Sequence, residues 1–322
     1  MQGVLDWEVV PVKKKGPVLV RARFGCLSSL HSLNITRGCS FDCIYCYARS
    51  FTNSPPRKTV YLYQNLVQEL TRQLDSPFRK TRIKGVVFNT ASDCFQPHPD
   101  ILKATFEAME TILLRGIDLH VLTKGVIPKP FFGLFSDHLS SVKPSIGLVP
   151  DNPVYKVIFE PNAPSFVERL KNIENLNRIG YAPGIRMDPL IPFLTDQTDL
   201  LELFFKTLKG FDVGSITVSY IHLRPAIRKE FQYRLPELYK KIIQLAFPSS
   251  EYHQVGTSTL TRLIPVSLRH KGYQKIKDIA HHFGFTVRVC QCKNPDLQGD
   301  LCYSDQSQPS EENLPEQLPL FT

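Results

Sequence analysis

Short β-type runs alternate with helical patterns between residues 33 and 220, and this alternation restricts the possible folds more than any other feature of the chain. Strands that are joined by crossover helices lie parallel to one another in one sheet. The pattern therefore predicts the α/β fold class, with six βα units. The predicted strands cover residues 33–36, 85–89, 118–123, 145–149, 183–187 and 215–220, and the predicted helices cover residues 61–74, 101–113, 166–179 and 199–208.

The pattern changes after about residue 225. Helices are predicted at residues 235–247 and 266–283, whereas the end of the chain is polar, rich in Pro and Gln, and expected to be disordered. We therefore expect four parts, which are an N-terminal extension (1–30), an α/β domain (31–225), a C-terminal helical extension with a cysteine group (226–302) and an acidic disordered tail (303–322).

Composition and charge limit where the chain works and what it binds. Hydrophobic residues make up 42% of the 322 residues and charged residues 21%, which is enough for a normal core. Neither an apolar run of about 18 residues nor an N-terminal signal core is present, so we expect a cytoplasmic protein that does not enter a membrane. The net charge is +9, and it becomes +13 without the tail, which carries four acidic and no basic residues. A body this basic attracts polyanions, of which nucleic acid is the usual one.

Three cysteines, Cys39, Cys43 and Cys46, lie within eight residues just after the first predicted strand. A four-iron cube normally takes four thiolates, so these three leave one iron open to another ligand. A zinc site is the alternative, because a second cysteine group near Cys290 is available to complete it. A disulfide is not expected in a chain without any mark of secretion.

The three cysteines belong to a longer string with a known counterpart. Residues 34–38 precede Cys39, an aromatic residue precedes Cys46, and Tyr47 and Ala48 follow. This string resembles the signature of radical S-adenosylmethionine (SAM) enzymes. The resemblance implies a partial (βα)6 TIM-like barrel with a C-terminal extension, whose catalytic groups lie at the carboxyl ends of the strands. It also implies a 4Fe-4S cluster whose open iron chelates SAM, an electron donor such as flavodoxin or ferredoxin, and a 5′-deoxyadenosyl radical that takes a hydrogen atom from the substrate.

Further strings resemble one branch of this family, the spore photoproduct lyase-related (SplB-like) branch, over residues 23–296. They are residues 89–97, 122–125, 160–164, Arg169, 185–192 and 195–196. The resemblance implies a lyase that acts on a nucleic-acid-related substrate, in particular a DNA lesion. Two alternatives stay open, which are a radical SAM enzyme that modifies RNA, a peptide or a small metabolite, and a non-enzymatic, metal-stabilised nucleic-acid-binding protein.

Five side chains are candidates for binding SAM, all of them beside these strings. Ser92 and Asp93 follow the second predicted strand and are expected to hold the amino group or the ribose. Lys124 is similar to a family lysine that contacts the SAM carboxylate, where a cation forms a charge-assisted hydrogen bond. Arg186 is expected to neutralise anionic groups, and Tyr47 to face the adenine or the methionine part. The alternatives are a solvated loop lysine, an ion pair for Arg186 and a packing role for Tyr47.

Cys94 is the candidate for a catalytic hydrogen donor. In the lyase that gives the branch its name, a hydrogen-donating cysteine lies just before the Ser-Asp pair, where this chain has Thr90 or Ala91. Neither residue can donate a thiol hydrogen, which puts thymine-dimer lyase activity in doubt. Cys94 lies a few residues later and is a displaced donor, an extra cluster ligand or a buried structural thiol.

A second cysteine group near the end of the chain contains Cys290, Cys292 and Cys302. Their spacing suits a second metal site, either an iron–sulfur cluster or zinc. The remaining ligand would come from Cys26, Cys94 or His281. The alternative is three unliganded thiols in a reducing compartment.

The string Gln317–Phe321, one residue before the end of the chain, resembles the short peptide with which bacterial polymerases and mismatch-repair proteins bind the sliding clamp. Such a peptide places Leu and Phe side chains in apolar pockets of its partner. We therefore expect a sliding clamp as a partner, with docking onto the protein's own body as the alternative.

Overall fold

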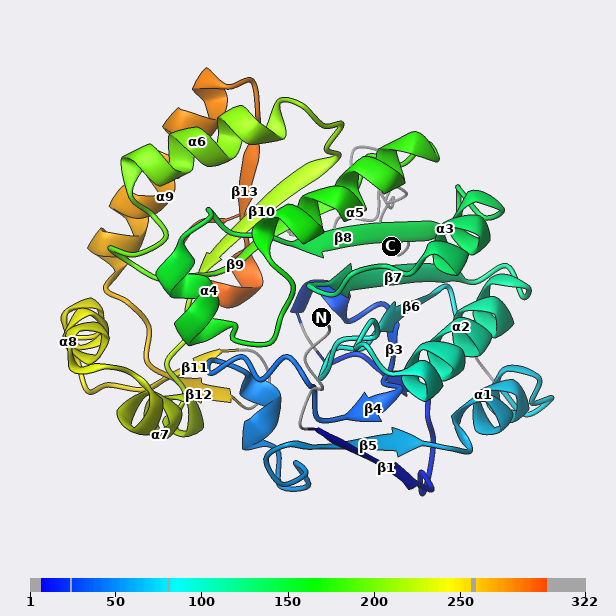
Figure 1. Ribbon diagram of the computed structural model, residues 1–322. Helices are drawn as coiled ribbons and strands as arrows, with labels where there is room; N and C mark the ends of the chain where they lie inside the picture. Colours follow the sequence, from blue (N-terminus) through cyan, green and yellow to red (C-terminus); the bar gives the residue numbers. More distant parts are fainter. Residues whose placement is uncertain (1–6, 24, 80–81, 256–258, 300–322) are drawn as a thin grey trace, which may run out of the picture.

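A mostly parallel sheet forms the centre of the protein in the computed structural model, which describes residues 7–23, 25–79, 82–255 and 259–299 (Figure 1). Within these residues the sheet has eight strands in the order β13-β10-β9-β8-β7-β6-β3-β2. All neighbouring pairs are parallel except β2 with β3. The first and last strands of this order, β13 and β2, are the two open edges. The strands are β2 Val20–Arg21, β3 His31–Leu33, β6 Gly85–Phe88, β7 Asp118–Thr123, β8 Val142–Gly147, β9 Gly184–Leu190, β10 Ser215–Tyr220 and β13 Val287–Val289.

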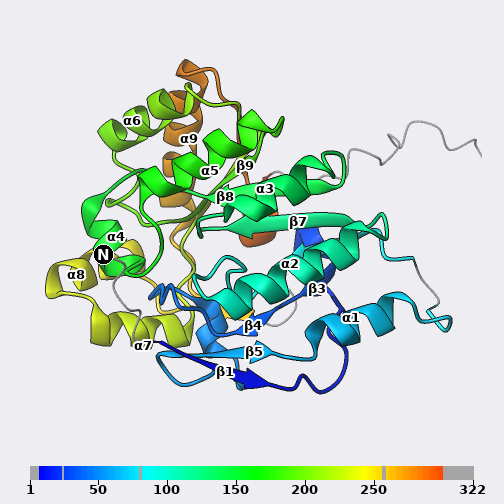
Figure 2. The ribbon, with the colours of Figure 1, turned by 45° about the vertical axis from the view of Figure 1, so that its right-hand side comes forward.

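Helices surround the outside of this sheet (Figures 1 and 2). The first helix, for example, buries an apolar stripe of Leu66, Leu70 and Leu74, which recur at helical spacing. α2 packs on β7, α5 on β8 and α9 on β13, while α1 packs on α2 and α6 on α9. The outer helices are α1 Leu66–Leu74, α2 Pro99–Leu113, α3 Lys129–Ser136, α5 Phe166–Arg178, α6 Thr198–Leu208 and α9 Val266–His282.

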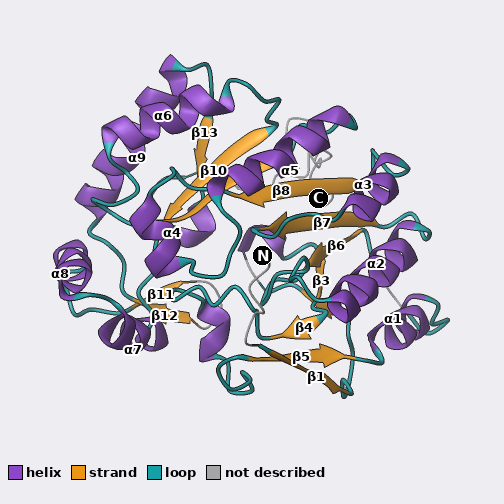
Figure 3. Ribbon diagram, viewed as in Figure 1, coloured by secondary structure: helices purple, strands orange, loops and turns teal. Residues whose placement is uncertain are grey.

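Smaller elements cover the ends of the strands, where the arrowheads of β7 and β8 end among loops (Figure 3). One small sheet has the order β1-β5-β4, and a hairpin pairs β11 with β12. The remaining elements are β1 Glu8–Val12, β4 Thr36–Arg37, β5 Thr59–Tyr63, α4 Pro153–Phe159, α7 Pro225–Arg234, α8 Glu237–Ala246, β11 His253–Val255 and β12 Thr259–Thr261, with the 3-10 segments η1 Gly25–Leu27, η2 Tyr47–Ser50 and η3 Gln291–Lys293.

The predicted α/β class and the TIM-like arrangement are confirmed, but several elements differ from the sequence prediction. Residues 61–63 were predicted as the start of a helix, yet they end β5, because they pair with β1 from the N-terminal part of the chain. The predicted first strand is divided between β3 and β4, which belong to different sheets. The extension after residue 225 is not purely helical, since β13 adds a strand beside β10.

Among the described residues, no helix is long and apolar enough to span a bilayer. The predicted disordered tail, with Gln317–Phe321, and Cys302 of the second cysteine group lie outside the described residues.

Candidate functional site

Cys39, Cys43 and Cys46 lie on the loop between β4 and η2 and line one cavity of about 40 Å³. All three side chains are half-buried. The other lining residues are Gly38, Asp42, Ala48, Arg49, Ser54 and Ala91. Three thiols that share one small cavity are a suitable donor set for an iron–sulfur cube, in which each thiolate binds its own iron.

The backbone of this loop depends on two left-handed positions. Gly38 has φ +86°, and a Cβ there would lie 2.7 Å from Cγ of Pro55 and 2.9 Å from the carbonyl oxygen of Thr59. Only glycine fits such a position. Asp42 has φ +50°, and its carboxylate forms ion pairs with Arg49 and, at 2.9 Å, with Arg234 of α7. These contacts hold the loop in place from two sides.

Hydrogen bonds from two later loops, one after β6 and one after α4, fix the same loop. The backbone N–H of Ser40 donates to Oε1 of Gln96 at 2.7 Å, and Nδ2 of Asn162 donates to the Ser40 carbonyl at 3.1 Å. Oγ1 of Thr36 lies 2.9 Å from Oγ of Ser92. The hydroxyl of Ser92, predicted to bind SAM, therefore has a protein partner beside the loop. Ala91, one residue earlier and one of the two positions matched to the donor cysteine, lines the cysteine cavity and has no thiol.

Asp93 connects the ends of β6 and β7. Its carboxylate accepts hydrogen bonds from Oγ1 of Thr123 at 2.7 Å, from the N–H of Lys124 at 2.8 Å and from the N–H of Phe95 at 2.9 Å. Burial raises the pKa of this carboxyl, and the three donors act in the opposite direction. Asp93 thus positions the backbone of Lys124, and direct contact with SAM stays a prediction.

The side chain of Lys124 lies beside the cysteine loop. Its Nζ lies 3.7 Å from Oε1 of Glu160, donates to the carbonyl of Asp188 at 3.2 Å, and lies 5.4 Å from the ring centroid of Tyr45. Tyr45 is the aromatic residue within the cysteine motif. Lys124, the predicted ligand of the SAM carboxylate, therefore contacts two oxygens and an aromatic ring next to the predicted cluster ligands.

Glu160 is a functional candidate that the sequence reasoning missed, although its string was noted. The side chain is almost completely buried and accepts hydrogen bonds from the hydroxyls of Tyr45 and of Tyr155. It also forms a buried ion pair with Arg169, which donates further to the carbonyls of Pro164 and Gly147. Burial disfavours the ionised form of Glu160, but the charges of Arg169 and Lys124 outweigh it and lower the pKa to about 2. Only the fold brings these groups together.

In the cysteine loop burial outweighs the nearby positive charges at Cys43, so the net pKa shift of this thiol is opposite to that of Glu160. Burial, and after it the charge of Glu160, raises the pKa of the Cys43 thiol to about 12. Burial also raises the pKa of Cys39. Metal ligation requires thiolates, so binding of iron has to displace these protons.

The other predicted SAM ligands have protein partners in this structure. The hydroxyl of Tyr47 donates to the carbonyl of Thr90, and the guanidinium of Arg224 lies 4.9 Å from its ring centroid. Nε of Arg186 lies 3.4 Å from Asp188, and its NH2 group lies 3.7 Å from Sγ of Cys290. Both side chains thus make protein contacts of the kind named as their alternatives, and contact of Tyr47 or Arg186 with SAM stays a prediction.

Cys94, the candidate hydrogen donor, is completely buried within the hydrophobic core. Burial raises the pKa of its thiol, and its carbonyl accepts a hydrogen bond from Oγ1 of Thr105. This is the environment of a buried structural thiol, which is one of the three roles expected for Cys94, and a role as hydrogen donor stays a prediction.

The second cysteine group gains a member from the N-terminal part of the chain. Sγ of Cys292 lies 3.4 Å from Sγ of Cys26 and 3.0 Å from Sγ of Cys290. Cys26, one of the residues predicted to complete the metal site, therefore lies beside the group. His281, another of these residues, is an exposed residue of α9.

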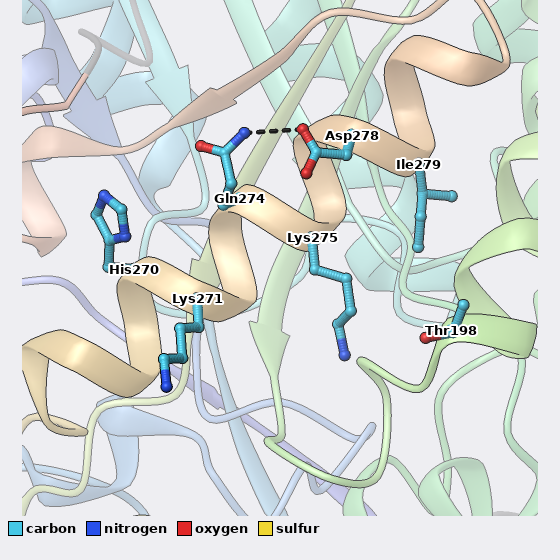
Figure 4. A pocket seen from close by; sticks show the side chains of 7 residues that line it. All are labelled: Thr198, His270, Lys271, Gln274, Lys275, Asp278 and Ile279. Atoms are coloured by element: carbon cyan, nitrogen blue, oxygen red, sulfur yellow. Dashed lines mark hydrogen bonds between the residues drawn. The ribbon is translucent and has the colours of Figure 1, made fainter.

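A separate hollow of about 450 Å³ lies between the start of α6 and α9 (Figure 4). Its lining includes Thr198, Lys271 and Lys275, and Nε2 of Gln274 donates to Asp278 across its edge at 2.8 Å. It shares no residue with the cysteine cavity.

Comparisons with solved structures agree with this architecture. A spore photoproduct lyase mutant superposes with a TM-score of 0.69 at 15% identity, covering 88% of this chain and 82% of that one. A second mutant lyase, with bound AdoMet and dinucleoside spore photoproduct, gives 0.68 at 14% identity with the same coverage. TsrM of Kitasatospora setae, a radical SAM methyltransferase with tryptophan bound, gives 0.52 at 10% identity, covering 86% of this chain and 56% of that one. These identities establish the fold alone.

Sequence comparisons supply the family. The uncharacterised protein ORF301 of Acidianus two-tailed virus is 23% identical over 62% of this chain and 69% of its own length. The uncharacterised protein Rv2578c of Mycobacterium tuberculosis is 24% identical over 66% of this chain, which spans 65% of that protein. The family model described as the radical SAM superfamily matches residues 33–204, more than half of the chain. The chain therefore belongs to the radical SAM superfamily.

Proposed function

We propose that this protein cleaves SAM reductively at a 4Fe-4S cluster held by Cys39, Cys43 and Cys46, and that it acts on a nucleic-acid substrate in the manner of a lyase. The arrangement of side chains around the three cysteines carries the first half of this proposal. The three thiols line one cavity, and Lys124 and Glu160 lie close enough to Cys43 to act on its pKa. Membership of the superfamily independently implies the cluster and SAM.

The residues around the cavity have distinct tasks in this proposal. When bound, the cluster supplies the electron that splits SAM into methionine and a 5′-deoxyadenosyl radical. Lys124 presents its ammonium group to the SAM carboxylate, and Glu160 with the carbonyl of Asp188 fixes where that group lies. Arg169 keeps Glu160 ionised, so Lys124 retains a counter-charge when SAM is absent. The half-buried loop limits the access of water to the thiolates.

Charge and likeness support a nucleic-acid substrate. Residues 1–302 carry a net charge of +13, which favours phosphate backbones. Arg224, at the start of α7, stacks over Tyr47 next to the last cluster ligand, so a cation lies beside the site. The structurally similar lyase was solved with a dinucleoside photoproduct bound, which makes damaged DNA the first substrate class to test. Since Ala91 lines the cavity without a thiol, the hydrogen atom returned to the product would come from a different donor than in that lyase.

Isotope transfer tests this proposal. Protein with a reconstituted cluster is reduced in the presence of SAM and ultraviolet-irradiated DNA made from deuterated nucleotides. Deuterium in the recovered 5′-deoxyadenosine, together with repaired DNA, supports the proposal. Deuterium transfer only from labelled RNA, a peptide or a small metabolite would replace the DNA half of it, as the fold shared with the tryptophan-bound methyltransferase allows. Absence of 5′-deoxyadenosine under every condition would remove the first half.

Replacement of Lys124 by Ala is expected to weaken SAM binding by about tenfold to a hundredfold, because a charge-assisted hydrogen bond is lost. The cluster should remain, since Lys124 is not a ligand, so iron content provides the internal control. Calorimetric titration of the reconstituted protein with SAM measures the effect. A matched control is Lys143→Ala, which removes a lysine of β8 whose Nζ donates to the nearby carbonyl of Ser140. Equal SAM affinity of the Lys124 variant and wild type would show that the carboxylate binds elsewhere.

Two protein partners belong to this proposal, an electron donor that the reaction requires and a sliding clamp, whose peptide ligands the terminal string Gln317–Phe321 resembles. We propose that a flavodoxin or ferredoxin in the cytoplasm supplies the electron, and that Gln317–Phe321, outside the described residues, binds a sliding clamp. Replacement of Leu320 and Phe321 by Ala is the variant that checks the clamp contact.

A further inference from the structure

Three cysteines meet where the two edges of the open sheet come together. Cys26 lies in η1, which follows the edge strand β2, whereas Cys290 and Cys292 follow the opposite edge strand β13. The sulfur of Cys292 lies 3.4 Å from that of Cys26 and 3.0 Å from that of Cys290. A Cβ at Gly25 would lie 2.5 Å from Cβ of Cys292, so the two turns approach this closely only because Gly25 is glycine.

The turn that carries Cys290 and Cys292 is anchored on the core. The N–H of Cys290 donates to the carbonyl of Val218 in β10 at 3.3 Å, and Nδ2 of Asn294 donates to the carbonyl of Cys290 at 2.9 Å. Oδ1 of Asn294 in turn accepts from Arg269 at 2.9 Å and from the hydroxyl of Tyr273 at 3.1 Å, both from α9. A supporting set of hydrogen bonds of this kind is what orients ligands at metal sites.

The surroundings favour thiolates at this position. NH2 of Arg186 lies 3.7 Å from Sγ of Cys290, and a nearby guanidinium stabilises a thiolate. Lys293, next to Cys292 in sequence, forms an ion pair with Asp188, which also pairs with Arg186. Three thiolates around a divalent ion leave one net negative charge, and Arg186 is placed to compensate it.

The spacing of the sulfur atoms indicates the kind of metal. Ligands of tetrahedral zinc with Zn–S distances of about 2.3 Å lie about 3.8 Å from one another. The observed distances of 3.0 and 3.4 Å are close to this value. In a four-iron cube each thiolate binds a separate iron, which requires wider spacing. Across the described ranges, no group of three or more His, Cys, Asp or Glu side chains is already arranged to hold a metal ion, so these three sulfurs would have to rearrange around the ion when it binds.

We propose that Cys26, Cys290 and Cys292 bind one zinc ion, which fastens the two edges of the open sheet to each other. Three thiolates occupy three of the four positions of tetrahedral zinc, and the fourth is left to another ligand. This site is separate from the loop of Cys39, Cys43 and Cys46 and does not depend on the function proposed for it.

Metal analysis of the full chain, with Cys302 retained throughout, tests the proposal. Wild-type protein purified anaerobically should hold about one zinc ion per chain, with zinc–sulfur distances of about 2.3 Å by X-ray absorption. Cys26→Ser and Cys292→Ser should each weaken zinc binding by at least about tenfold in competition with a chelator. Iron content after cluster reconstitution should stay at the wild-type level in both variants.

The matched control is Cys43→Ala, which should lose iron and keep zinc, so failure of the cluster proposal leaves the zinc result unaffected. Circular dichroism shows whether each variant folds, and cobalt substitution of the wild type gives thiolate charge-transfer absorption that does not rely on a variant. Several results would overturn the proposal: no bound zinc and no thiolate–cobalt absorption, a second iron–sulfur cluster that Cys26→Ser removes, or a Cys26–Cys292 disulfide that makes the anaerobic protein two hydrogen masses lighter.

Discussion

Replacement of Cys43 by Ala is expected to abolish SAM cleavage. Cys43 is the middle ligand of the three, its thiol lines the same cavity as Cys39 and Cys46, and no described residue of the cavity lining offers a fourth thiol. Two thiolates cannot hold a cube that already has one open iron. We expect iron and sulfide to fall to background and the rate of 5′-deoxyadenosine formation to fall by at least about a hundredfold. Metal analysis and chromatography of the reduced reaction measure these two quantities.

Cys26→Ser is the matched control for this loss. It replaces another half-buried cysteine, which lies in η1 and outside the cysteine cavity. Its rate of SAM cleavage should stay within about twofold of wild type, because the zinc site proposed for Cys26 lies outside the cavity lined by Cys39, Cys43 and Cys46. Wild-type rates of 5′-deoxyadenosine formation by the Cys43 variant would show that the cluster has other ligands.

Replacement of Glu160 by Gln is expected to lower the free energy of unfolding by about 3–5 kcal/mol, because it leaves the buried guanidinium of Arg169 without its counter-charge. The hydrogen bonds of Arg169 to the carbonyls of Pro164 and Gly147 remain, but they do not neutralise the charge. The same variant should bind SAM more weakly, since Lys124 loses the carboxylate charge, 3.7 Å away, that holds its ammonium group in place. Denaturant unfolding and SAM titration measure the two effects.

The difference in free energy of unfolding between wild type and Glu160→Gln should depend on pH, because it depends on the pKa of Glu160. Although burial opposes ionisation, Arg169 and Lys124 lower the folded-state pKa from 4.5 to about 2. A carboxyl whose pKa is lower in the folded than in the unfolded state stabilises the folded state. This stabilisation is about 3 kcal/mol here, and it is fully present at pH values above the unfolded-state pKa of 4.5. This contribution is lost as the pH falls from about 4.5 to about 2. The stability difference between wild type and Glu160→Gln should therefore shrink over that range.

Glu174→Gln is the control for the charge change. Glu174 lies on α5, the helix that carries Arg169, and pairs with Arg178 on an exposed surface. Such pairs contribute less than about 1 kcal/mol. An equal loss of stability in the two variants would mean that the ion pair of Glu160 and Arg169 contributes no more than a surface pair.

The sequence predicted the parallel sheet and the cysteine loop because each depends on local patterns. Strand runs and helical spacing are short-range signals, and β7 and β10 have the predicted bounds. The three predicted cluster ligands lie within one loop, so their spacing in the sequence indicates that they act together.

The remaining features depend on contacts between distant segments. The local pattern predicts a helix from residue 61, but residues 61–63 belong to β5, because they pair with β1 about fifty residues earlier and pairing overrides local propensity. Glu160 received no role because Arg169, Lys124 and Tyr45 reach it from three other elements. β13 has only three residues and becomes a strand through its ladder with β10, so no local pattern identifies it.

The position of β13 has a consequence for synthesis of the protein on the ribosome. This strand lies beside β10 in the sheet but follows it in sequence only after α7, α8, β11, β12 and α9. Until β13 emerges, the fully buried residues of β10 from Ile216 to Tyr220 have an unpaired edge that invites association with other chains. The contact between Cys26 and Cys292 spans 266 positions, among the last to form in a chain that is made from its N-terminus. Nascent chains of this protein should therefore depend on chaperones until β13, residues 287–289, has been translated.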